Sequence, residues 1–181
     1  EKKCAFCRTP TPTPDELVDQ YKKRAELGDT DAIRNLGCFY SGGSYGLPQD
    51  HAKALELWHR AAELGSAKSY YSIGVAYDIG NGVGRDEKNA NHYYELAAMR
   101  GHVTSRHNLG VFEMHGGNYD RALKHFILAS IGGMKQSLSA IQEMFKNGDA
   151  TKEDYTQALR AYQAYLGEIK SPQRDEAATF S

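Results

Sequence analysis

Small and hydrophobic residues recur along the chain at helical spacing, and the whole pattern repeats at a fixed distance. Leu36-Gly37 returns as Ile73-Gly74 and as Leu109-Gly110, at spacings of 37 and 36 residues. An Ala-Ala pair leads to Gly65, and a second Ala-Ala pair leads to Gly101, 36 residues later. Self-similarity at a period of about 20–50 residues is typical of stacked structural repeats, so the chain is predicted to be a repeat array.

Each repeat predicts two helices, of which the first carries the Leu-Gly mark and the second carries the Ala-Ala pair. The first helices are predicted at residues 31–42, 67–80, 103–115 and 134–147, and the second helices at 51–64, 87–100, 119–131 and 152–169. A further helix is predicted over about 14–27, and a short one from Ser171-Pro172. Since one helix pair cannot cover its own apolar stripe, neighbouring pairs must stack. The predicted fold is all-α, an α/α solenoid wound as a right-handed superhelix of helix-turn-helix repeats.

Polar and glycine residues mark the ends of these helices. Asp50 and Asp86 stand where an N-cap side chain accepts bonds from free backbone amides. Gly65 and Gly101 stand where a left-handed residue ends a helix with least strain. Thr13-Pro-Asp-Glu16 has the form of a capping box with Pro at the first helical position. These signals support the predicted boundaries.

Three further glycines, Gly37, Gly74 and Gly110, lie inside predicted helices, where Gly costs ~1 kcal/mol relative to Ala. We expect close contact with a neighbouring helix to compensate for this cost.

The repeat resembles a known family. The matching positions in the first unit are Ala32, Leu36, Gly37, Tyr40, Gly46, Asp50, Lys53, Ala54, Trp58, Ala61, Ala62 and Gly65. This pattern is similar to the Sel-one-like repeat, a relative of the tetratricopeptide repeat. Residues 67–101 match almost as well, 103–133 match with a shortened loop, and 134–166 are degenerate. The resemblance implies a protein-interaction adaptor or scaffold without catalytic residues.

The same pattern suggests how the chain is divided. Residues 1–13 are interpreted as the end of a zinc finger plus a linker, and residues 14–181 as the repeat array. Within the array we expect a partial unit at 14–30, repeats at 31–66, 67–102, 103–133 and 134–170, and a C-terminal cap at 171–181.

Charge and composition exclude several classes of partner. The 22 Lys and Arg residues nearly cancel the 23 Asp and Glu residues, so no overall field attracts nucleic acid or an anionic membrane. No run approaches the ~18 apolar residues of a membrane span. Three cysteines are too few and too scattered for a disulfide framework, which favours a reducing, intracellular compartment, cytoplasmic or nuclear. The expected partner is therefore a protein or peptide, and the oligomeric state stays open.

The N-terminal Cys4-x-x-Cys7 pair has four interpretations. A redox pair needs a strand before it and a helix after it, and here Thr-Pro-Thr-Pro follows soon after. A complete zinc site needs four ligands, and no second pair exists in the chain. Two interpretations stay open: the last ligand pair of a RING-type zinc finger, or an inert tail. Zinc would then bind Cys4 and Cys7 only within a longer protein, and no cofactor is expected in this chain.

Helical spacing around the Leu-Gly mark predicts which side chains of the first helices line a concave binding groove. The predicted groove residues are Arg34, Asn35, Cys38, Lys68, Tyr71, Val75, Asp78, His107, Asn108, Val111 and His115, together with Asp31, Ser41, Ser72, Thr104, Ser139, Glu143 and Lys146. Arg34-Asn35 and His107-Asn108 suggest a grip on a peptide's terminal carboxylate, because Arg can bond both oxygens. The alternative is that Asn35 and Asn108 hydrogen-bond neighbouring helices.

The sequence therefore favours a non-catalytic scaffold that binds a peptide or protein segment in this groove. One version is the substrate-recruiting part of a RING-type ubiquitin ligase, and the other is a free-standing adaptor with an inert Cys pair. An enzyme with an unrecognised site around His107 and Cys38 is a third interpretation.

Overall fold

The computed structural model describes residues 12–169. The Cys4–Cys7 pair and the short helix predicted from Ser171 lie outside the described residues. Residues 12–169 form nine α-helices and no strand. In chain order the helices are α1 (Pro14–Glu26), α2 (Thr30–Gly42), α3 (His51–Glu63), α4 (Ala67–Ile79), α5 (Glu87–Met99), α6 (Val103–His115), α7 (Tyr119–Ile131), α8 (Lys135–Asn147) and α9 (Lys152–Ile169). Each boundary predicted within these residues lies within one residue of the observed one.

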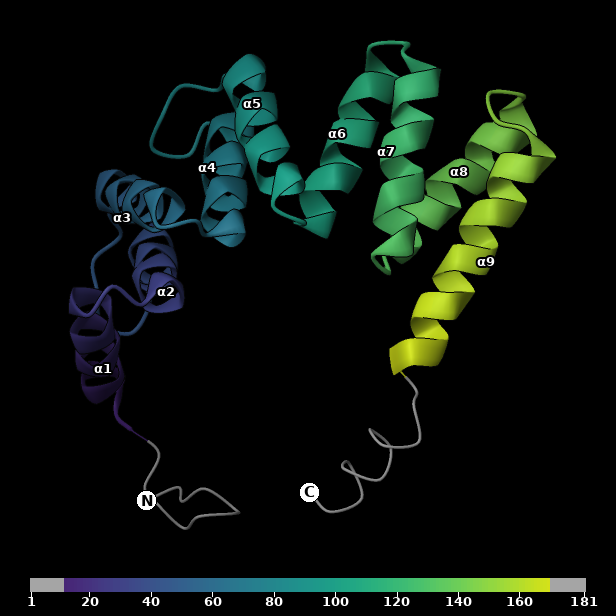
Figure 1. Ribbon diagram of the computed structural model, residues 1–181. Coiled ribbons are helices and arrows are strands. Elements are labelled where there is room, and N and C mark those ends of the chain that lie inside the picture. The colour runs from purple at the N-terminus through teal and green to yellow at the C-terminus, as the bar shows by residue number, and fades with distance from the viewer. Residues whose placement is uncertain (1–11, 170–181) are drawn as a thin grey trace. The chain divides into compact units, whose positions relative to one another are not determined.

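The chain forms two compact units, an N-terminal unit that ends at Tyr93 and a C-terminal unit that begins at Tyr94. The boundary falls inside α5. In the N-terminal unit α2 and α3 form a helical hairpin, with α1 packed on α2 and α4 packed on α3 (Figure 1). In the C-terminal unit α6 and α7 form the corresponding hairpin, α8 packs on α7, and α9 packs on both α7 and α8. Each unit is thus a stack of antiparallel helix pairs.

The predicted helix caps are confirmed. The Asp50 carboxylate accepts the Lys53 amide at 2.8 Å, and the Asp86 carboxylate accepts the Asn89 amide at 3.0 Å. Thr13 and Glu16 form the reciprocal capping box at the start of α1. Gly65 and Gly101 adopt φ angles of +94° and +84°, directly after the last turns of α3 and α5. These local signals mark the starts of α1, α3 and α5 and the ends of α3 and α5.

Two glycines inside helices mark the closest approach between the helices of a hairpin. A Cβ at Gly37 would lie 2.5 Å from Nε1 of Trp58, and a Cβ at Gly110 would lie 2.7 Å from the Phe126 ring. The predicted close contact is confirmed at both positions. Trp58 and Phe126 are themselves buried and form the centres of apolar clusters, one in each unit. In both hairpins the aromatic ring of the second helix therefore packs against the glycine of the Leu-Gly pair on the first helix.

The connection between α6 and α7 is short and tightly bonded. The buried Glu113 carboxylate accepts the Asn118 side-chain amide at 2.9 Å and forms an ion pair with Arg121 at 2.9 Å. The Asn118 backbone amide also donates to the Glu113 carbonyl at 2.8 Å. One carboxylate at the end of α6 thereby fixes the loop and the first turn of α7.

Candidate interaction surface

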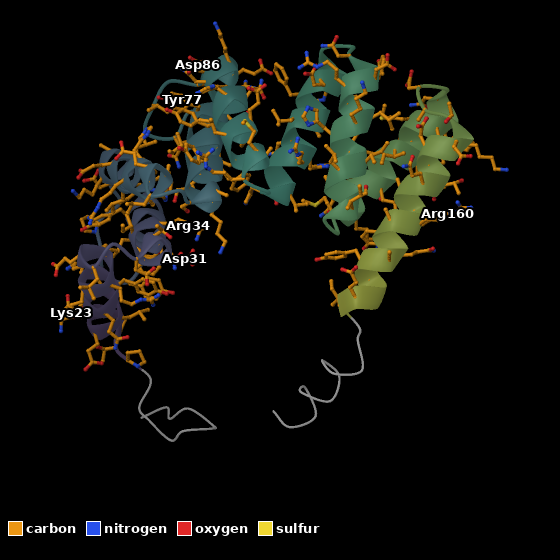
Figure 2. All side chains as sticks on the ribbon, in the orientation of Figure 1. Lys23, Asp31, Arg34, Tyr77, Asp86 and Arg160 are labelled. Atoms are coloured by element: carbon orange, nitrogen blue, oxygen red, sulfur yellow. The ribbon has the colours of Figure 1, made fainter. Side chains whose placement is uncertain are left out.

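The first helices of the N-terminal unit, α2 and α4, present neighbouring polar side chains. The Lys68 ammonium on α4 lies 3.6 Å from the Asp31 carboxylate on α2, and both side chains are 61% exposed. Figure 2 shows Asp31 and Arg34 on the same helix, α2. Side chains from successive repeats therefore share one surface, which we call the α2–α4 face (Asp31, Arg34, Asn35, Lys68 and Tyr71); Asp31 and Lys68 are exposed, and the other three are half-buried.

Arg34 is the most constrained cation of the α2–α4 face. Its Nη1 donates to the Asn35 carboxamide oxygen at 2.8 Å, and its backbone carbonyl accepts a bond from Trp58 Nε1 at 3.2 Å. Its Nε is buried and has no hydrogen-bond partner among the described residues. Asn35 thus orients the guanidinium within α2. This bond is local, whereas the alternative interpretation placed Asn35 against a neighbouring helix.

Four of the predicted residues of this unit are only partly exposed. Tyr71, Val75 and Asp78 are half-buried on α4. Cys38 is half-buried on α2 and packs against the apolar cluster around Trp58. The Cys38 thiol therefore has the environment of a small core residue. Arg34, Lys68 and Tyr71 are the side chains of this unit best suited to contact a partner.

In the C-terminal unit, His107 is held between helices. Its Nδ1 lies 2.8 Å from the hydroxyl of Ser137 on α8, and Ser137 is fully buried. Its ring centroid lies 5.4 Å from that of Phe126 on α7. Desolvation by burial lowers the pKa of His107 below its usual value. These contacts join α6 to α8, which is a packing role.

The remaining predicted residues of α6 differ in exposure. Asn108 and Val111 are half-buried, whereas His115, at the end of the helix, is exposed. His115 lines a hollow of about 440 Å³ together with Glu143. We call this the acidic hollow; its lining residues are Met114, His115, Tyr119, Ala140, Glu143, Met144, Asn147 and Asp149. Two predicted groove residues from neighbouring first helices, His115 and Glu143, are thus brought together.

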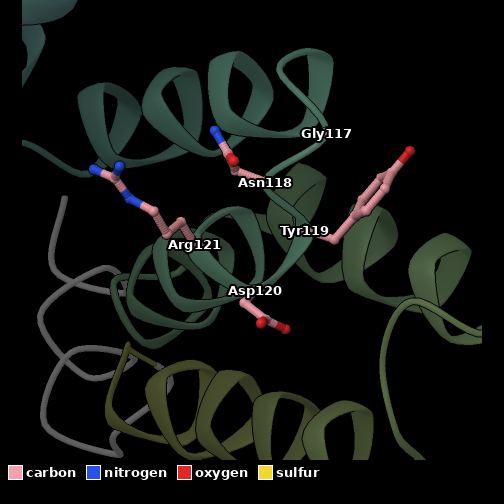
Figure 3. A pocket seen from close by; sticks show the side chains of 5 residues that line it. All are labelled: Gly117, Asn118, Tyr119, Asp120 and Arg121. Carbon is pink, nitrogen blue, oxygen red and sulfur yellow. The ribbon is translucent and has the colours of Figure 1, made fainter.

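Sequence reasoning missed the rest of the acidic hollow. Asp149 follows α8, and Tyr119 begins a second helix, so neither belongs to the helical face on which the prediction was based. A second hollow of about 420 Å³ is lined by consecutive residues from Gly117 to Arg121. Figure 3 shows Tyr119 and Arg121 pointing in opposite directions from the start of α7. The short α6–α7 loop, visible in the sequence as Gly-Gly-Asn-Tyr, is the signal that points to both hollows.

The described part of the chain has neither a metal-ion cluster nor a membrane-spanning helix. Within residues 12–169, no group of three or more His, Cys, Asp or Glu side chains is arranged to hold a metal ion. No described helix combines the length and the apolarity that crossing a bilayer demands. Cys4 and Cys7 lie outside these residues, so the zinc-finger interpretation stays a prediction.

Comparison with known proteins places this geometry in context. The chain is 33% identical over 114 residues to the ERAD-associated E3 ubiquitin-protein ligase component HRD3B of Arabidopsis thaliana. That match covers 61% of this chain and 17% of the length of HRD3B. The structure is similar to a Sel1 repeat protein from Oxalobacter formigenes, with a TM-score of 0.73 and 28% identity over 83% of this chain and 64% of that one. It is also similar to c5321, an antigen of uropathogenic Escherichia coli that displays an SLR fold, with a TM-score of 0.70 and 28% identity over 84% of this chain and 36% of that one.

The family model named Sel1 repeat matches four segments, residues 30–66, 67–102, 104–134 and 138–163, which together make up more than half of the chain. The helical hairpins, the Leu-Gly contacts and these four matches agree, and the all-α repeat fold expected from the sequence is confirmed. The chain belongs to the Sel1 repeat family.

Proposed function

We propose that this chain is a scaffold that binds a peptide or protein segment through the exposed faces of its first helices. Sel1 repeat proteins act as protein-interaction scaffolds and are generally non-catalytic, and this chain is such a repeat scaffold. The observation that carries the proposal is the 3.6 Å contact between Lys68 and Asp31, because it joins exposed side chains of successive first helices. A surface built from successive repeats is suited to an extended segment.

The α2–α4 face offers chemistry for such a segment. Arg34 supplies a guanidinium whose orientation Asn35 fixes at 2.8 Å, and Arg is able to bond both oxygens of a carboxylate. Tyr71 adds a half-buried aromatic ring, a residue type enriched among side chains that dominate binding energy. We propose that Arg34 and Tyr71 contribute most to binding in the N-terminal unit, with a partner carboxylate as the group that Arg34 recognises.

Variants of these two residues provide the test. The intact chain and an Arg34→Ala, Tyr71→Ala variant would capture proteins from a lysate of the source organism, and mass spectrometry would identify those retained. A matched control replaces Arg160, on α9, and Tyr165 by Ala. The proposal expects at least one partner that the chain and the control retain and the Arg34/Tyr71 variant loses. Equal retention by all three proteins, with unchanged helicity, would contradict it.

We further propose that the repeats recruit substrates within a larger ubiquitin-ligase assembly. Two observations support this: the relative HRD3B is named as an E3 ubiquitin-protein ligase component, and Cys4-x-x-Cys7 resembles the end of a RING-type finger. A free-standing adaptor with an inert Cys pair is the second candidate, because the last ligand pair alone cannot complete a four-ligand zinc site.

Zinc content separates the two candidates. A longer protein that contains this chain would be analysed for bound zinc, with a Cys4→Ser, Cys7→Ser variant as control. Stoichiometric zinc that falls in the variant supports the RING-type assembly. A longer protein without bound zinc would favour the free-standing adaptor.

A further inference from the structure

The acidic hollow of the C-terminal unit is built at the ends of three helices. Helix α6 ends at His115, α8 ends at Asn147, and α7 begins at Tyr119. Its volume of about 440 Å³ falls within the range of about 300–1,000 Å³ typical of ligand pockets. The hollow is therefore large enough to take a long side chain from a partner.

The floor of the hollow is apolar. Met144 is 2% exposed and belongs to the apolar cluster around Phe126, and the half-buried Met114 and Ala140 pack against the same cluster. Methionine is unbranched and polarizable, so it adapts to the shape of an inserted alkyl chain. The floor thus suits the aliphatic part of an amphipathic side chain.

The rim of the hollow is negative. Among the described residues, the side chains of Glu143 and Asp149 take part in no ion pair or hydrogen bond. The last carbonyls of α6 and α8 carry the negative ends of these helix dipoles, and the last turns of the two helices also carry the basic side chains His115 and Lys146. Asp120, in the first turn of α7, offsets the positive end of that helix. Lys146 lies one turn beyond Glu143 and forms no ion pair with it in the described part of the chain.

We propose that the acidic hollow binds an arginine side chain of the segment that this scaffold recognises. The guanidinium would bond the free carboxylates of Glu143 and Asp149, while its aliphatic stem lies on Met114 and Met144. Tyr119, 43% exposed on the rim, offers a ring on which a guanidinium stacks. This stacking favours arginine over lysine, whose ammonium is a compact and strongly hydrated point charge. The inference rests on the proposed binding of a protein segment and adds one chemical requirement to that segment.

Methionine methyl groups allow a direct test in the intact chain. N-acetyl-arginine amide would be titrated into protein carrying ¹³C-labelled methionine methyls, and N-acetyl-citrulline amide, similar in shape but uncharged, would serve as the control ligand. We expect saturable shifts of the Met114 and Met144 methyl signals with the arginine ligand alone. The signals of Met99 and Met134, which do not line the hollow, should stay in place. No saturable shift, or equal shifts with citrulline, would overturn the proposal.

Two charge-neutralising variants show whether the rim is responsible. Glu143→Gln with Asp149→Asn should weaken binding of the arginine ligand about tenfold, because charge-assisted hydrogen bonds are lost. Glu63→Gln with Glu168→Gln removes two exposed carboxylates elsewhere and should leave binding unchanged. Equal weakening in both variants, or in neither, would overturn the assignment to Glu143 and Asp149.

This test is separate from that of the proposed function. A scaffold that captures partners through Arg34 and Tyr71, yet shows no shift with the arginine ligand, would retain the proposed function and lose this inference. Arginine-specific shifts, together with equal capture of partners by the parent chain and the Arg34/Tyr71 variant, would support binding in the acidic hollow. They would contradict binding on the α2–α4 face.

Discussion

Gly37 and Gly110 occupy the same position in two repeats, and in each case an aromatic ring from the second helix fills the space where a side chain would stand. The added Cβ would lie 2.5 Å from Trp58 Nε1 at Gly37 and 2.7 Å from Phe126 at Gly110. Protein cores are close-packed, so neither ring is able to yield without disturbing its own neighbours. A single missing side chain thereby sets the distance between two helices.

We predict that Gly110→Ala lowers the free energy of unfolding by about 1–3 kcal/mol, the usual cost of an overpacked core. We expect this loss even though Ala favours the helical conformation over Gly by about 1 kcal/mol. Gly167→Ala is the matched control, because Gly167 lies within α9 and a Cβ at that position would meet open space.

Gly167→Ala should raise the free energy of unfolding by about 0.5–1 kcal/mol through helix propensity alone. Urea denaturation of both variants and the parent chain measures the difference. An equal gain in both variants would show that Phe126 does not restrict position 110.

At the scale of helices, much was predictable from the sequence, because each signal needed only local chemistry. The N-cap carboxylates of Asp50 and Asp86 and the capping box at Thr13 bond amides three residues away, so spacing along the chain reveals them. The repeat period then fixed which helix pairs with which. Burial of the Leu-Gly mark against the next helix follows from that pairing.

Contacts that depend on three-dimensional neighbours were not predictable in this way. His107 was placed in the groove by helical spacing, and only the fold shows that Ser137, 30 residues later, meets its Nδ1 at 2.8 Å. Likewise, the acidic hollow forms because the ends of α6 and α8 lie beside each other and the loop that joins α6 to α7 is short. The spacing of residues along one helix does not show which residues of other helices they contact.

Two half-buried histidines, His107 and His125, predict how the free energy of unfolding responds to pH. Burial lowers the pKa of His107 and of His125 in the folded chain, relative to the usual 6.5. The unfolded chain therefore binds more protons below about pH 6.5, and the free energy of unfolding should fall as the pH falls through that region. The pKa values of Asp29 and Asp154 are lowered from the usual 3.8, so these two carboxylates affect the free energy of unfolding only at more acidic pH.

Urea denaturation at pH 8, 7, 6 and 5 measures this dependence. A His107→Gln variant should show a shallower fall between pH 7 and 5 than the parent chain. Replacement of the exposed His92 by Gln serves as the control and should leave the fall as steep as in the parent. A His107→Gln profile parallel to that of the parent would contradict the linkage.

At the scale of the whole molecule, the two compact units have their own apolar clusters. Trp58 and Ile73 belong to a cluster of the N-terminal unit, and Phe126 and Ile141 to that of the C-terminal unit. In a repeat array each element contacts only its neighbours, so stability is a sum of local terms. A perturbation in one unit should therefore weaken nearby helices more than distant ones.

We predict that Ile141→Ala, at a fully buried position, accelerates amide hydrogen exchange in α7, α8 and α9 and leaves α2 and α3 nearly unchanged. The expected loss is about 2–5 kcal/mol in the C-terminal unit, the usual range for this substitution in a core. Ile73→Ala is the reciprocal variant and should act on the N-terminal unit. Uniform acceleration across both units would show one cooperative structure instead of two.

Site-specific photo-crosslinking shows whether partners bind the first helices of the repeats. A photo-reactive phenylalanine analogue would replace Tyr71 or Val111 on first helices, or Glu63 or Lys124 on second helices, in the intact chain. After irradiation in a lysate, mass spectrometry would identify crosslinked proteins. We expect shared crosslinked partners from the first-helix positions and none of these from the second-helix positions. The same partners crosslinked only from Glu63 and Lys124 would place recognition on the second helices and show that the first helices are not the binding surface.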